Sequence, residues 1–94
     1  MTTSLFRQSV HNSAPPQKIS VYLQATWYDA KGDREKAHTL IQDLNDNDAA
    51  WIHAYLHRKE GDDGNAGYWY SRAAKRRPGI SLEAEWETIV SALL

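Results

Sequence analysis

Residues Trp27–Ala37 have the sequence WYDAKGDREKA, and part of this pattern returns 29 residues later in residues Leu56–Ala66, LHRKEGDDGNA. In both segments a Gly-Asp pair is followed by an alanine that lies five residues after the glycine. The glycine can end one helix in a left-handed turn, the aspartate can cap the next helix, and the small alanine lets two antiparallel helices approach closely. The pattern therefore predicts two helical hairpins built from one repeated unit.

The rest of the chain places apolar residues at helical spacing, and no segment shows the alternation of a strand. We expect about five helices: from about Gln17 to Lys31, after a cap at Asp33, after the turn Asn45–Asp48 and up to Glu60, from about Gly64 to Arg76, and after a cap at Ser81. The clearest apolar stripe belongs to the closing helix and consists of Leu82, Trp86, Ile89, Val90 and Leu93. These features predict an all-α fold.

The first sixteen residues differ from the remainder in composition. Pro15 and Pro16 cannot lie inside a helix, and the preceding residues are mostly polar. Leu5, Phe6 and Val10 could form one short amphipathic turn. We therefore expect a partly ordered arm over residues 1–16 and a single helical domain over residues 17–94.

Seven residues between Lys18 and Pro78 lie at the spacing of a known helical repeat: Ala25, Tyr28, Ala54, Ala66, Tyr70, Ala73 and Pro78. In these positions the chain resembles the tetratricopeptide repeat family. The resemblance implies stacked antiparallel hairpins with a concave face that binds a peptide. The chain departs from the family because its first unit is five residues shorter than the usual ~34, and because His53 and His57 replace Leu and Tyr. Two units are fewer than such arrays need, so the closing helix and the arm must supply the missing cover.

Composition and charge limit the function. The chain of 94 residues has no cysteine, and its 11 basic and 12 acidic residues give a net charge of −1. This balance argues against nucleic-acid binding, which normally requires a basic excess. No segment approaches the ~20 apolar residues that span a bilayer, and residues 1–12 lack the apolar core of a secretory signal, so we expect a cytoplasmic protein without membrane contact. No group of residues indicates catalysis, and we expect a non-catalytic protein without a cofactor.

One face of the predicted third helix combines aromatic and cationic residues: Trp51, Tyr55, Arg58 and Lys59. Aromatic residues and arginine are enriched at the centres of protein interfaces. The tetratricopeptide resemblance implies that this face lines the groove together with three residues of the first unit: Tyr22, Thr26 and Asp29. Our first hypothesis is therefore a protein-interaction module whose groove binds a peptide or a partner protein. The alternative is that the N-terminal arm covers the two aromatic residues.

The same helix carries His53, His57 and Glu60 on one face. Two histidines four residues apart on a helix can bind one divalent metal ion, and Glu60 could add an oxygen ligand. The second hypothesis is therefore a small-molecule or metal-binding domain centred on these three residues. From the sequence we prefer the competing structural interpretation, in which the imidazoles are hydrogen-bonded parts of a half-buried interface beside Tyr70 and Trp86 and no metal is bound.

The first predicted helix has a second apolar face that its own hairpin does not require. This face carries Ile19, Leu23 and Trp27. A soluble monomer seldom leaves such a patch bare. We expect either that the arm covers it or that another copy of the chain does, which would make the protein a homo-oligomer.

Overall fold

The computed structural model describes all 94 residues, which form six α-helices and no strand. The helices are α1 (Thr3–Ser9), α2 (Val21–Ala30), α3 (Arg34–Ile41), α4 (Asn47–Lys59), α5 (Asp63–Arg72) and α6 (Leu82–Leu93). The all-α prediction is confirmed, but the expected number of helices is one too low. The additional helix is α1, which lies in the predicted arm and begins where the Thr2 side chain accepts a hydrogen bond from the Leu5 amide.

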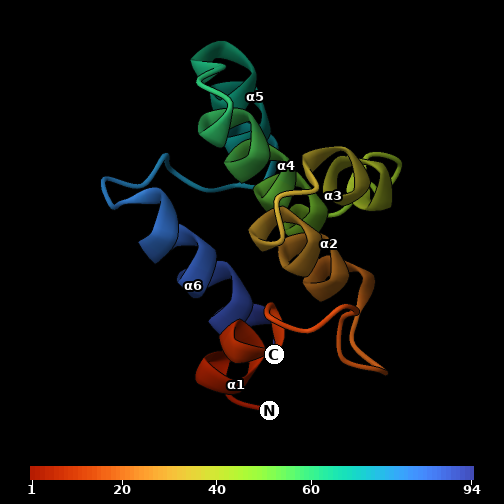
Figure 1. The fold of residues 1–94 in the computed structure, drawn as a ribbon. Helices are drawn as coiled ribbons and strands as arrows, with labels where there is room; N and C mark the ends of the chain where they lie inside the picture. Colours follow the sequence, from red (N-terminus) through yellow and green to blue (C-terminus); the bar gives the residue numbers. More distant parts are fainter.

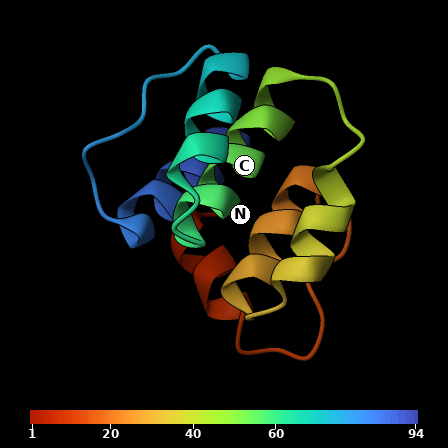
Figure 2. The same ribbon diagram turned by 90° about the horizontal axis from the view of Figure 1, so that it is seen from above.

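Two antiparallel hairpins, α2–α3 and α4–α5, form the centre of the molecule and lie side by side (Figure 2). Each hairpin turns at a glycine in the left-handed region, with φ of +93° at Gly32 and +81° at Gly61. The aspartate that follows each glycine caps the next helix: Asp33 accepts from the Lys36 amide and Asp62 from the Asn65 amide. The repeated Gly-Asp pair therefore has the structural role that the sequence predicts.

Two predicted helix boundaries are wrong. The first large helix begins at Val21 rather than near Gln17, because Ser20 caps it and Lys18 adopts a φ of 62°. Helix α5 ends at Arg72 rather than Arg76, because Ala74 turns the chain with a φ of 58°. The segment after Ala74 crosses to α6 without regular secondary structure.

Helix α6 packs against both hairpins, through α2 and α4, and α1 packs against α6 (Figure 1). Trp86, Ile89 and Val90 of its apolar stripe are buried, and the Phe6 ring of α1 lies 5.9 Å from the Trp86 ring between centroids. The closing helix therefore packs where the two hairpins meet rather than on the second hairpin alone. It joins the two units into one core together with α1.

The second apolar face of α2 is covered within the chain. Trp27 is buried, and its indole N–H donates a 3.2 Å hydrogen bond to the Ser9 hydroxyl of α1. Leu23 is also buried, while Ile19 is partly buried. Of the two expected arrangements, the arm supplies the cover over Trp27, and self-association stays a prediction. None of the six helices is long and apolar enough to cross a membrane.

Candidate functional site: a three-histidine cluster

The face of α4 that was expected to line an open groove is buried. Trp51 is 7% exposed and Tyr55 3% exposed, and Thr26 and Asp29 of α2 are also buried. The cover is α6, since the Trp86 indole N–H donates a 2.9 Å hydrogen bond to the Thr26 carbonyl oxygen. The expectation of an open groove is therefore wrong, and the expected alternative cover, the N-terminal arm, is not what lies over Trp51.

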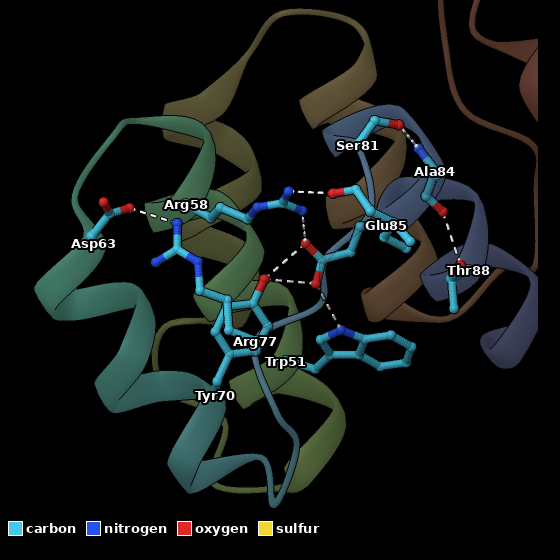
Figure 3. Close-up of polar contacts among 10 residues, drawn as sticks. Trp51, Arg58, Asp63, Tyr70, Arg77, Ser81, Ala84, Glu85 and Thr88 are labelled. Atoms are coloured by element: carbon cyan, nitrogen blue, oxygen red, sulfur yellow. Dashed lines mark hydrogen bonds and ion pairs between the residues drawn. The ribbon is translucent and has the colours of Figure 1, made fainter.

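Glu85 of α6 is the residue that fixes α6 in this groove (Figure 3). Its carboxylate is completely buried and accepts hydrogen bonds from the Arg58 guanidinium at 2.8 Å and from the Trp51 indole at 3.3 Å. The Tyr70 hydroxyl donates to both carboxylate oxygens, at 2.8 and 2.7 Å. Burial, together with this hydrogen bond, raises the pKa of Tyr70, which keeps the phenol a donor. Arg58 also donates to the Ile80 carbonyl oxygen, so its guanidinium already has hydrogen-bond partners within the chain.

The remaining predicted groove residues also have partners within the chain. Lys59 lies 3.1 Å from a carboxylate oxygen of Asp29 and joins α4 to α2. The Tyr22 hydroxyl donates a 2.6 Å hydrogen bond to Asp46, the N-cap of α4. These contacts join α2 to α4 and to its N-cap, so the predicted groove residues are engaged within the fold.

The strongest cluster of chemically active side chains lies on the opposite face of α4. His53 and His57 of α4 meet His38 of α3, and each of the three residues offers a nitrogen within 4.8 Å of the others. The Nε2 atoms of His38 and His53 are 2.7 Å apart. The rings of His53 and His57 stack at a 5.0 Å centroid distance, and His38 stands at 80° to both. We call His38, His53 and His57 the histidine cluster.

Helix α5 supplies the platform for this cluster. The Trp69 ring stacks on the His53 ring at a 3.9 Å centroid distance and an angle of 17°. The Arg72 guanidinium lies over the Trp69 ring, 5.4 Å from its centroid. The neighbour of His53 is therefore Trp69 rather than the expected Tyr70 and Trp86, which lie on the Glu85 side of the fold.

The environment keeps His53 neutral near pH 7. Burial, followed by the charge that His38 and His57 carry when protonated, lowers the pKa of His53 from 6.5 to about 4. A neutral imidazole has a free nitrogen lone pair, which is the form that binds a metal ion. The Nδ1 atom of His57 is buried and has no hydrogen-bond partner in the protein. Its nearest carboxylate oxygens belong to Glu60, at 3.7 Å, and to Asp62, at 3.9 Å.

A pocket of about 500 Å³ opens beside the cluster. All of its lining residues are polar or ionisable: Arg34, Glu35, His38, His57 and Glu60. His53 does not line it, because this ring is covered by Trp69. The predicted set of His53, His57 and Glu60 is thus brought together by the fold, and His38, Arg34 and Glu35 complete it from α3.

His38 is the residue that sequence reasoning missed. It lies 15 residues before His53 on a different helix, so no helical spacing connects the two. Its place in the repeat could have identified it. His38 directly follows Ala37, the alanine at which the two helices of the first hairpin approach each other, so its side chain was expected near a helix–helix contact. The chain matched no protein-family model, no curated protein and no solved structure. The resemblance to tetratricopeptide repeats therefore stays a prediction, and the role of the cluster has to follow from its own geometry.

Proposed function

We propose that this protein is a small helical domain that binds one divalent transition-metal ion through His38, His53 and His57. The observation that carries the proposal is the convergence of three imidazoles from two helices, with a nitrogen of each within 4.8 Å of the others. Imidazole is a preferred ligand of zinc, copper, nickel and iron in proteins. Three histidine ligands, with a fourth coordination position left for water or a substrate, are a known arrangement around zinc.

The nitrogen separations in the cluster run from 2.7 Å up to a limit of 4.8 Å, so an ion would draw some of the rings together and push others apart. At a metal–nitrogen distance of ~2.0–2.1 Å, tetrahedral ligand atoms lie roughly 3.3–3.4 Å apart. The His38 and His53 nitrogens are closer than this, at 2.7 Å, because they share a proton. For both Nε2 atoms to bind a metal ion, the donor ring must carry its proton on Nδ1 instead, and the two nitrogens must separate by roughly 0.7 Å. Rotation of the His38 ring can provide this, because His38 is only partly buried.

Glu60 has a supporting role in this proposal. A histidine that binds a metal with one ring nitrogen usually donates its other N–H to a carboxylate or carbonyl, which orients the ring. The buried Nδ1 of His57 lies 3.7 Å from the Glu60 carboxylate, which must move closer before it can accept a hydrogen bond. Glu60 would therefore orient His57 rather than act as a principal ligand.

Peptide or protein binding in the groove, which the tetratricopeptide resemblance implies, is the weaker proposal. It would require α6 to leave, which would expose Trp86 and remove the buried partner of Arg58. No such cost applies to the histidine cluster, which already faces a pocket. We therefore place the function at the cluster.

The test is a calorimetric zinc titration of protein without a histidine tag. We expect one zinc ion per chain, and we expect His38→Gln or His57→Gln to weaken binding by at least about 100-fold, more than loss of a supporting residue. The matched control is His11→Gln, since His11 is exposed and belongs neither to the cluster nor to the pocket lining. Absence of zinc binding, or equal binding by all variants with intact folds, would refute the proposal.

A further inference from the structure

We infer that the metal ion keeps one coordination position open toward the pocket, and that this position takes a small oxyanion, either a carboxylate or a phosphate, with Arg34 as its second contact. This inference rests on the proposed metal site. It names the chemical class of ligand that the site accepts. Three features of the structure support it: the closed side of the cluster, the charge around the pocket and the free donors of Arg34.

The three histidine ligands would lie on the side of the metal ion that faces the protein core. His53 is 7% exposed, and its ring is stacked between His57 and Trp69. His38 and His57 are the two members that also line the pocket. A metal ion held by all three rings would therefore have the core side occupied and its fourth position directed to the pocket. Three protein ligands with one open position distinguish reactive zinc sites from structural ones, which have four.

The charge of the loaded site favours an anion. The ionisable residues that line the pocket, apart from the histidines, are Arg34, Glu35 and Glu60, while the Asp62 carboxylate, 3.9 Å from His57, is not part of the lining. A divalent ion and Arg34 together carry one positive charge more than the two carboxylates. Without the ion the same pocket has a net negative charge, so anion binding should depend on the metal. Bound cations are often the largest local charge in such sites.

Arg34 has the donors that an oxyanion needs. It is the first residue of α3, and its side chain is 54% exposed at the rim of the pocket. Its only charged contact is Glu60, at 3.7 Å, and it makes no hydrogen bond within the protein. A guanidinium presents five N–H donors in a planar fork that matches carboxylate and phosphate oxygens. Arg34 can therefore hold one oxygen of a ligand while another binds the metal.

The experiment uses the full chain loaded with one equivalent of cobalt(II), whose visible absorption depends on its ligands. Acetate and methylphosphonate are titrated separately, which distinguishes a carboxylate ligand from a phosphate-like one. We expect at least one of them to shift the cobalt bands, with a half-saturating concentration at least tenfold higher in Arg34→Gln. The control is Arg76→Gln, an exposed cation outside the pocket, which should titrate like the unmodified protein.

Each contrary result has its own meaning. Histidine-dependent cobalt bands that neither anion changes would overturn the open-position inference and leave the metal site standing. A response of equal size in Arg34→Gln would overturn the role of Arg34. Absence of cobalt bands that depend on His38 would refute the metal site and this inference with it.

Discussion

The Nε2 atoms of His38 and His53 lie 2.7 Å apart on rings that come from different helices and meet edge to face. At this distance one nitrogen must donate and the other must accept, so the pair holds one proton between them. A second proton on this pair would place two N–H groups head to head and give the pair a positive charge. Acid should therefore separate the rings, whereas a metal ion can bind both Nε2 atoms once the donor ring carries its proton on Nδ1.

The free energy of unfolding should fall as the solution becomes acidic. Burial lowers the pKa of His53 from 6.5 to about 4, so the unfolded chain binds this proton at a higher pH than the folded chain does. The stabilising contribution is complete above about pH 6.5 and is lost as the pH falls to about 4. The full loss of stability amounts to about 3 kcal/mol. Urea denaturation of metal-free protein at a series of pH values measures it.

A comparison of two variants isolates the His53 contribution. His53→Gln should have a shallower dependence of stability on pH between 6.5 and 4, while His11→Gln should keep the original slope because His11 is exposed. An unchanged slope in His53→Gln would show that other groups cause the acid sensitivity.

Trp51→Ala should strongly destabilise the protein. The indole is 7% exposed, donates to Glu85 and has the Lys75 ammonium 4.1 Å from its ring centroid. Truncation of a buried tryptophan costs about 3 to 5 kcal/mol, a large part of the stability of a small domain. Tyr68→Ala is the matched control, because Tyr68 is 53% exposed. Thermal melting that shifts equally little in both variants would show that Trp51 is not part of the core.

Glu85→Ala should destabilise the protein by about 3 to 5 kcal/mol, because it leaves the half-buried Arg58 guanidinium without its carboxylate. Glu85→Gln should cost less, because the amide keeps the volume and an acceptor oxygen. Glu83→Ala, two residues away on the same helix, should change stability by less than about 0.5 kcal/mol, since its carboxylate is mainly exposed. Equal effects of Glu85→Ala and Glu83→Ala in urea denaturation would contradict the assigned role of Glu85.

The hairpins could be predicted from the sequence because their signals are local. A Gly-Asp pair determines both the left-handed turn and the next N-cap, as at Gly32 and Asp33. Helix α1 was harder to predict, because it has only seven residues and is stabilised by burying Phe6 and Ser9 against the rest of the chain. Short helices depend on tertiary packing more than on local propensity.

Sequence patterns predicted only those residues of the site that lie on a single helix. His53 and His57 share a face of α4 by their spacing, but the approach of His38 depends on how α3 packs, which no local pattern determines. The prediction of an open groove was wrong for a similar reason. The stripe of α6 shows that this helix is buried but not where it docks. Glu85 offered a signal, because it lies three residues after Leu82 and four before Ile89, on the apolar face.

The most direct test of the metal site is a long-range proton–nitrogen NMR spectrum of the imidazole rings, recorded with and without one equivalent of zinc. The chain has four histidines, so the spectrum can be assigned with single substitutions. We predict that zinc moves the Nε2 signals of His38 and His53 and one nitrogen signal of His57, while His11 does not change. Unchanged signals from His38, His53 and His57 in the presence of zinc, or a change confined to His11, would contradict the proposed site.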